Sequence, residues 1–212
     1  MGEQTGALFT HREFIGKYEA EILMRNIFLF MMVSLDGYYE GPNGDISWHN
    51  AANNEFNEFA VRQTSESDIL LFGRKTYELM ESYWPTEAAK RDDPIVAGLM
   101  NSLPKIVVSK TLTSVEWENT RLIKENVAEE ISKLKKQPGK DIAILGSSEL
   151  TMSLTNMELV DEYRIMINPV VLGSGKSLFR GLANRLNLKF IKSKTFNSGN
   201  ILLYYRPDYK NG

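Results

Sequence analysis

The chain has 212 residues, of which 42% are hydrophobic and 25% are charged, as in ordinary globular proteins. Its 25 basic and 27 acidic residues leave a formal net charge of -2, which argues against a broad surface for nucleic acid or an anionic membrane. There is no cysteine and there are two histidines, so disulfides, thiol nucleophiles and thiolate or histidine-rich metal sites are excluded. We therefore expect no metal centre, no nucleic-acid partner and no membrane partner.

The N-terminal segment has neither the basic start nor the long apolar centre of a signal peptide. No apolar run in the chain approaches the roughly 20 residues that cross a bilayer, so we expect a cytoplasmic protein. Met24 directly precedes the first strong strand pattern. Residues 1–23 are therefore interpreted as an extension outside the fold, and residues 24–212 as one domain.

Apolar runs separated by glycine, proline and polar residues predict a series of buried strands. The first run covers residues 26–34, and the glycine-rich segment 36–47 that follows it predicts a long mobile loop. Further strands are expected at residues 68–72, 105–108, 115–118, 121–123, 141–145, 160–168, 188–196 and 201–206. Helices are expected at residues 50–64, 74–83, 95–103, 126–137 and 148–156, with a polar loop at 85–94 and Asn126 as a helix cap.

The alternation of strands and helices along the chain predicts an α/β fold with a mainly parallel sheet. The last two strands are joined by Asn197, Ser198, Gly199 and Asn200, a sequence typical of a hairpin turn. An antiparallel hairpin is therefore expected at the C-terminal end of the sheet.

One predicted strand-to-helix junction carries glycine, two cations and a hydroxyl: Gly73, Arg74, Lys75 and Thr76. Backbone N–H groups and the helix dipole favour a phosphate at such a helix start, and the side chains add charge and hydrogen bonds. The alternative is that the glycine serves the turn alone, as it does in many α/β proteins.

A second junction, at Gly146, Ser147 and Ser148, has a similar composition. Gly146 lets the backbone approach a ligand, and either serine can cap the helix or contact a phosphate. Ser109 and Lys110 follow a third strand and are suited to a second phosphate, such as the 2′-phosphate of NADPH, although a lysine just past a strand is usually solvated. Junctions of this kind at the carboxyl ends of parallel strands are where open α/β sheets bind ligands.

The segment 173–177, Gly-Ser-Gly-Lys-Ser, is similar to part of a nucleotide-triphosphatase loop. That loop requires a glycine five positions before its second glycine, and Val170 occupies this position here. A glycine turn between sheet elements is the preferred interpretation.

The run from Gly73 to Glu78 resembles the Gly-Arg-Lys/His-Thr-Trp/Tyr-Glu motif of dihydrofolate reductases. Its spacing from Ser109 and from Gly146 is also similar to the cofactor side of that family. Segments 34–37, 161–163 and 168–175 resemble one branch, the reductase (RibD C-terminal) domain of riboflavin biosynthesis and its stand-alone bacterial relatives. The similarity covers residues 25–206.

The resemblance implies a dihydrofolate reductase-like fold: a twisted, mainly parallel sheet with helices on both faces and NADPH across the strand ends. By it, the residues of the three junctions hold the phosphates and the adenosine side, and Leu150 helps line the diphosphate and nicotinamide. Met32 and the loop from Asp36 close over the nicotinamide ring, and Trp48 meets cofactor and substrate. At the position of the carboxylate that binds folate in true dihydrofolate reductases this chain has Asn53, and Ser147 replaces the second glycine of a Gly-Gly pair.

These features together predict an NADPH-dependent reductase of a small heterocyclic or carbonyl substrate. The nearest implied activity is that of 5-amino-6-(5-phosphoribosylamino)uracil reductase. Asp36 is the first candidate proton donor and Glu55 a weaker one, with water as the alternative. A different class, a non-catalytic nucleotide-binding protein on the same fold, stays open. Relatives often pair through the late strands, so a homodimer is expected.

Overall fold

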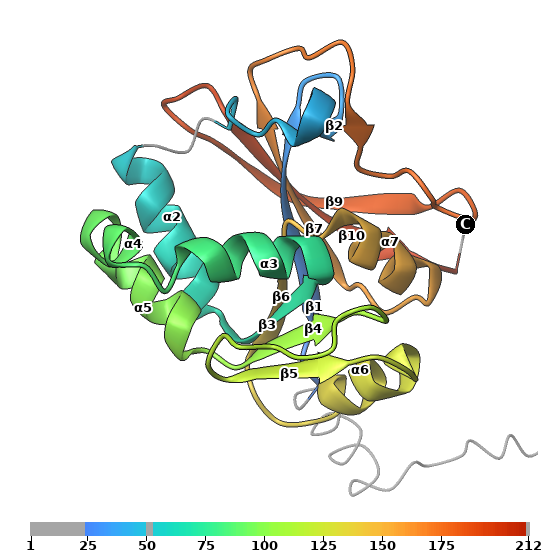
Figure 1. Cartoon of the computed structure of the whole chain (residues 1–212). Helices are drawn as coiled ribbons and strands as arrows, with labels where there is room; N and C mark the ends of the chain where they lie inside the picture. The colour runs from blue at the N-terminus through green and yellow to red at the C-terminus, as the bar shows by residue number, and fades with distance from the viewer. Residues whose placement is uncertain (1–23, 50–52, 211–212) are drawn as a thin grey trace, which may run out of the picture.

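The computed structural model describes residues 24–49 and 53–210; the predicted extension 1–23 lies outside the described residues (Figure 1). The strands are β1 (Ile27–Ser34), β2 (Tyr38–Glu40), β3 (Ser67–Gly73), β4 (Lys105–Val108), β5 (Thr120–Ile123), β6 (Asp141–Leu145), β7 (Glu162–Asn168), β8 (Lys176–Ser177), β9 (Asn187–Thr195) and β10 (Ile201–Asp208). The helices are α2 (Asn54–Ser65), α3 (Arg74–Tyr83), α4 (Glu87–Asp92), α5 (Pro94–Ser102), α6 (Val127–Lys135) and α7 (Ser148–Asn156).

The main sheet has eight strands in the order β5-β4-β3-β6-β1-β7-β10-β9. The first six in this order are parallel, and β10 runs antiparallel to both β7 and β9. The expected parallel sheet with an antiparallel C-terminal hairpin is therefore confirmed. β2 and β8 form a separate two-stranded sheet.

The side chains of β1 alternate between two cores. Ile27, Leu29 and Met31 pack on the side of α6 and α7, whereas Phe28 belongs to a second core with residues of α3 and α5. Met32 belongs to a third group, with Phe59 of α2. Successive residues of a strand point to opposite faces, so β1 is buried on both sides, and the expectation of helices on both faces is confirmed (Figure 1).

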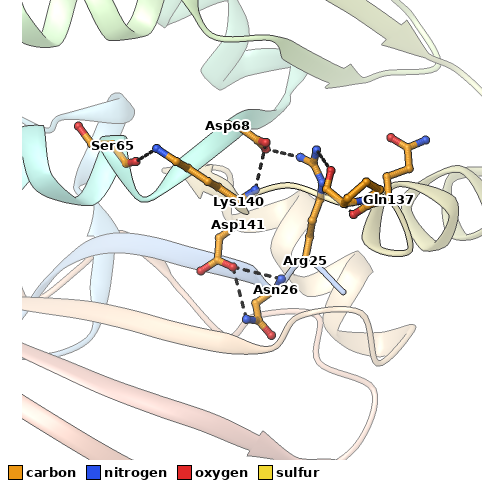
Figure 2. A network of polar contacts seen from close by, with 8 residues as sticks. Arg25, Asn26, Ser65, Asp68, Gln137, Lys140 and Asp141 are labelled. Atoms are coloured by element: carbon orange, nitrogen blue, oxygen red, sulfur yellow. Dashed lines mark hydrogen bonds and ion pairs between the residues drawn. The ribbon is translucent and has the colours of Figure 1, made fainter. Parts of the chain in front are cut away.

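A polar network joins the residues just before β1 to the start of β3 and to the segment that leads into β6 (Figure 2). The Arg25 guanidinium pairs with the carboxylate of Asp68, and its Nε donates to the carbonyl of Gln137 at 3.3 Å. Asp68 also accepts from the backbone N–H of Lys140 at 3.1 Å. Arg25 is buried, so its charge depends on these acceptors. The network holds together the amino ends of the parallel strands, at the edge of the sheet opposite their carboxyl ends.

Several local predictions were wrong. The segment 85–94 is not all loop, because Thr86 caps the short helix α4 by accepting from the Ala89 N–H at 3.2 Å. Residues 115–118 form no strand; instead, buried Trp117 donates its backbone N–H to the Tyr77 hydroxyl at 3.1 Å. The loop expected at 36–47 includes β2 and a 3-10 turn. Asn126 stands at the N-cap of α6 with a left-handed backbone and makes no side-chain cap bond.

Within the described ranges, 24–49 and 53–210, no helix combines the length and the apolar character that a membrane span requires.

Candidate functional site

A cavity of about 320 Å³ lies where β3, β4 and β6 end, close to the lower limit of about 300 Å³ for small-molecule sites. The three strands are neighbours in the sheet, in the order β4-β3-β6, so their carboxyl ends meet at one edge. The lining includes ten of the eleven residues predicted to bind cofactor, all except Met32: Gly73, Arg74, Lys75, Thr76, Ser109, Lys110, Gly146, Ser147, Ser148 and Leu150. The three junctions, far apart in sequence, thus form one site.

The first two junctions contact each other directly. The backbone N–H of Gly73 donates to the hydroxyl of Ser147 at 3.0 Å, and the Thr76 hydroxyl donates to the carbonyl of Gly146 at 3.4 Å. A Cβ at Gly73 would lie 3.5 Å from the Cβ of Leu150, so the two helix starts are packed closely. Among the residues that the structure describes, no side chain caps the N-terminal N–H groups of α3 or α7. These donors suit an anion in the cavity.

The backbone conformation of the junction after β6 explains why it carries glycine at position 146 and tolerates serine at position 147. Gly146 has a φ of 72°, in the left-handed region that favours glycine. Ser147 has a φ of -91°, outside the left-handed region that favours glycine. The replacement of the second glycine of the pair by serine is therefore compatible with this loop, and the serine hydroxyl adds the bond to Gly73.

Four cations line the cavity. Arg74 pairs with Glu78 at 3.1 Å, and Lys75 lies 3.8 Å from the carboxylate of Glu149. Lys176 pairs with Glu40. Lys110 makes no ion pair with any residue of the described ranges. Its uncompensated charge fits an additional phosphate.

The small sheet of β2 and β8 supplies lining residues that the sequence reasoning did not assign to the cofactor site: Tyr39, Glu40 and Lys176. Glu40 accepts a hydrogen bond from the Lys176 ammonium group, which raises the pKa of Lys176. β8 follows the glycine turn expected at residues 173–175, where Gly173 and Gly175 have positive φ. No local pattern indicates this site contact, because it depends on the pairing of two distant strands.

Two predicted residues lie outside the cavity lining. Met32 is buried in the core beside α2. Trp48 is half-buried, its indole N–H donates to the carbonyl of Asp45 at 3.0 Å, and its ring meets His49 edge-on at 4.4 Å between centroids.

Asp36 also lies outside the cavity lining. Its carboxylate accepts the backbone N–H groups of Leu172 at 3.1 Å and Gly173 at 2.8 Å, and so joins the end of β1 to the loop before β8. A hydrogen bond from the Ser34 hydroxyl and these two N–H groups hold the pKa of Asp36 below its usual value. A carboxylate in this state is a poor proton donor at neutral pH.

The helix α2 carries the other two residues of interest. Asn53, at the position where folate reductases carry a carboxylate, caps the helix by accepting the Phe56 N–H at 2.9 Å. Glu55 accepts the Asn197 N–H at 2.9 Å and pairs with Lys194 at 3.2 Å. These contacts lower the pKa of Glu55, the Asn197 bond contributing most. Both side chains are therefore engaged in hydrogen bonds within the fold.

The parallel sheet, its antiparallel C-terminal hairpin and the helices on both faces define an α/β protein with a dihydrofolate reductase-type fold. Residues 25–202 match the family described as the RibD C-terminal domain, so the chain belongs to this family.

Individual relatives agree with this assignment. The chain is 37% identical over 182 residues to the uncharacterized protein YyaP of Bacillus subtilis (strain 168), which covers 85% of this chain and 94% of YyaP. A putative riboflavin biosynthesis protein from Shewanella sp. PV-4 superposes with a TM-score of 0.70 and 25% identity, over 86% of this chain and 99% of that chain. A diaminohydroxyphosphoribosylaminopyrimidine deaminase/5-amino-6-(5-phosphoribosylamino)uracil reductase from Thermotoga maritima superposes with a TM-score of 0.63 and 14% identity, over 92% of this chain and 59% of that chain.

Proposed function

We propose that the protein is an NADPH-dependent reductase of a small heterocyclic or carbonyl compound, acting at the strand-end cavity. One observation carries the proposal: three separate strand ends bring two helix starts and Lys110 around one cavity, and within the described part of the chain the helix starts have no side-chain cap and Lys110 has no ion pair. The family supports a reductase of the riboflavin-pathway type. A cytoplasmic location stays a prediction.

The residues of the cavity suit a dinucleotide that carries a diphosphate and a separate 2′-phosphate. The first-turn N–H groups of α3 and α7, with Arg74 and Ser148, would hold the diphosphate, and Ser109 and Lys110 would hold the 2′-phosphate. When bound, a reduced nicotinamide supplies a hydride to the carbon of a C=N or C=O bond, whose nitrogen or oxygen then takes up a proton. The carboxylate of Asp36 is ionised and hydrogen-bonded, so water is the proposed proton source.

Within the family's known chemistry, reduction of a ribosylaminopyrimidine phosphate is a better proposal than reduction of folate. A folate reductase uses a carboxylate on the first helix, and the side chain at that position here is the helix cap Asn53. The Thermotoga relative is described as a 5-amino-6-(5-phosphoribosylamino)uracil reductase. We propose this substrate class as the nearest one.

The decisive experiment is a fluorescence titration of the protein with NADPH and NADH. We expect NADPH to bind more tightly, Arg74→Ala to weaken both cofactors, and Lys110→Ala to remove the preference for NADPH. Losing one charged hydrogen bond costs about 1.5–3 kcal/mol, or about tenfold or more in affinity. The control is Lys136→Ala, an exposed lysine outside the cavity lining. Equal affinities of the unaltered protein for NADPH and NADH would remove the 2′-phosphate assignment.

A non-catalytic nucleotide-binding protein is the second candidate. The observation that favours it is that both carboxylates considered as acids, Asp36 and Glu55, accept backbone N–H groups instead of facing the cavity. Measuring NADPH oxidation in the presence of pterins, pyrimidines and quinones distinguishes a reductase from a non-catalytic nucleotide-binding protein. Tight binding of NADPH without turnover of any compound would favour this second function.

We also propose a homodimer that forms through the hairpin of β9 and β10. Phe190 is 60% exposed and Ile201 is 40% exposed, and the Phe190 ring lies 5.8 Å from the ring of Tyr205. Exposed apolar side chains on an edge hairpin are typical of interaction surfaces.

A further inference from the structure

The strand-end cavity has a wall that does not belong to the main sheet. This wall is the small sheet of β2 and β8, which lies past the carboxyl end of β1 and contributes Tyr39, Glu40 and Lys176 to the lining (Figure 1). Lys110 lies on the opposite side, after β4, and the sheet continues from β4 through β3 and β6 to β1. The cavity therefore runs from Lys110, past the starts of α3 and α7, to the wall of β2 and β8.

This direction decides which half of a dinucleotide meets the wall. With the 2′-phosphate at Lys110 and the diphosphate at the two helix starts, the nicotinamide riboside half extends towards β2 and β8. The hydroxyls and the carboxamide of that half need hydrogen-bond donors and acceptors. The pair of Glu40 and Lys176 offers both and brings no net charge. The wall thus suits the half of the cofactor that carries no separate phosphate.

A close approach at Gly175 holds the outer end of the wall. Gly175 directly precedes β8 and has a φ of 149°, a conformation that strains an L side chain. A Cβ on this residue would clash with the backbone carbonyl oxygen of Glu40 and would lie 3.2 Å from the Cα of Gly41. Because these neighbours are backbone atoms of a packed turn, a side chain at Gly175 would displace β2 and the Glu40 carboxylate with it.

Asp36 anchors the inner end of the wall, next to β1. Its carboxylate accepts the backbone N–H groups of Leu172 at 3.1 Å and Gly173 at 2.8 Å, in the loop that leads to β8. At the same end, the backbone N–H of Leu178 donates to the carbonyl of Gly37 at 3.3 Å. The segments before β2 and around β8 are therefore bonded to each other, and Asp36 supplies the charged acceptor of this link.

We propose that Asp36 and Gly175 are positioning residues for the cofactor. They hold β2 against β8, so that Glu40 and Lys176 present their polar groups to the nicotinamide riboside half. Neither positioning residue lines the cavity: Asp36 acts through the loop before β8, and Gly175 acts through the backbone of Glu40. This inference rests on the proposed NADPH function and gives Asp36 a role other than proton donation.

Isothermal titration calorimetry with two ligands separates the wall from the rest of the cavity. NADPH has both halves of the cofactor, whereas adenosine 2′,5′-bisphosphate has only the phosphorylated adenosine half. Gly175→Ala and Asp36→Ala should each weaken NADPH binding by about fivefold or more, as for the loss of a hydrogen bond. Both variants should leave the affinity for adenosine 2′,5′-bisphosphate unchanged. A general loosening of the fold would instead weaken both ligands alike.

Gly181→Ala is the matched control. Gly181 also has a positive φ, of 95°, but a Cβ there meets no atom within 4 Å, and the residue lies outside the wall. This variant carries backbone strain without the clash, so it should keep both affinities. Asp36→Asn should bind NADPH more tightly than Asp36→Ala, because the amide oxygen still accepts one of the two N–H groups.

The outcomes separate this inference from the proposed function. If the unaltered protein binds neither ligand, the NADPH proposal falls and this inference falls with it. If it binds NADPH but not the bisphosphate, the direction of the cofactor in the cavity is wrong and the wall assignment fails. If it binds both, the inference alone is overturned by unchanged NADPH affinity in both variants, or by equal losses for the two ligands. Equal effects of Gly175→Ala and Gly181→Ala would also overturn it, and Asp36→Ala decides it if Gly175→Ala does not fold.

Discussion

The hydroxyl of Ser147 accepts the backbone N–H of Gly73 at 3.0 Å, and this bond joins the carboxyl ends of the neighbouring strands β3 and β6. It sets the start of α3 against the start of α7. Because the N–H groups of both helix starts face one cavity, their relative position decides how well they bind a single diphosphate. Ser147 is therefore a positioning residue as well as a lining residue.

Replacing Ser147 by alanine tests this role. The loss of one hydrogen bond is worth about 1 kcal/mol, so Ser147→Ala should bind NADPH about fivefold more weakly in a fluorescence titration. The control is Ser132→Ala on α6, whose hydroxyl donates to the Ala128 carbonyl of its own helix at 2.6 Å. Unchanged NADPH affinity in Ser147→Ala would show that the two helix starts are aligned without this bond.

We expect the carboxylate of Glu55 to stabilise the folded protein and to take no part in catalysis. The Asn197 N–H and Lys194 stabilise its carboxylate, so its pKa in the folded protein lies below the unfolded value of 4.5. Between these two pKa values the unfolded state binds more protons. The contribution of Glu55 to the free energy of unfolding is therefore complete above about pH 4.5 and is lost as the pH falls through the folded pKa.

Denaturant unfolding of the unaltered protein and of Glu55→Gln from pH 7 to pH 3 measures this effect. We expect the difference in unfolding free energy to be largest at pH 7 and to shrink below pH 4.5. NADPH affinity and turnover should be the same in both proteins. A variant with full stability but no turnover would instead make Glu55 a catalytic residue.

The elements around the strand-end cavity could be predicted from sequence because each depends on local patterns. The helix at 74–83 and the strands at 105–108 and 141–145 have the bounds that apolar runs and glycine breaks indicate. Gly73 is the last residue of β3, Lys110 comes two residues after β4, and Gly146 directly follows β6. Their approach in space therefore follows from the parallel pairing of neighbouring strands.

The remainder of the site depends on contacts that have no local pattern. Glu40 and Lys176 meet through the pairing of β2 with β8, 136 residues apart in the chain. Glu55 lies on the predicted helix 50–64, and only the position of the distant Asn197 N–H shows that its carboxylate has a partner. Trp117 lies in the segment 115–118, which is predicted to be a strand, but its backbone N–H donates to the Tyr77 hydroxyl from a loop. Tertiary contacts override propensity at each of these positions.

The proposed dimer gives a prediction about assembly. Phe190→Asp places a charge on the exposed apolar face of the hairpin, and burying an unpaired charge in an interface is unfavourable. We expect sedimentation to show a dimer for the unaltered protein and a monomer for the variant. Lys189→Asp, on the neighbouring residue of the same strand, is the control and should stay dimeric. A monomeric unaltered protein would contradict the dimer.

The Arg25–Asp68 pair should make a larger contribution to stability than the ion pairs on helix surfaces. The Arg25 side chain is 9% exposed, so Asp68→Ala leaves a buried guanidinium without its carboxylate. Losing one partner of a buried pair costs about 3–5 kcal/mol. Asp68 is 34% exposed, and water can partly replace it, so we expect a loss nearer about 2–3 kcal/mol in the free energy of unfolding.

The matched comparison is Glu129→Ala, which removes one carboxylate from Lys133 on the surface of α6 at a distance of 2.8 Å. Both side chains are more than half exposed, and such i,i+4 pairs contribute about 0.3–0.5 kcal/mol. Chemical denaturation of the two variants under the same conditions measures the loss of unfolding free energy in each, and so the ratio of the two losses. Equal losses in Asp68→Ala and Glu129→Ala would mean that the carbonyls of Gln137 and Pro138, which also accept from Arg25, hold the guanidinium without Asp68.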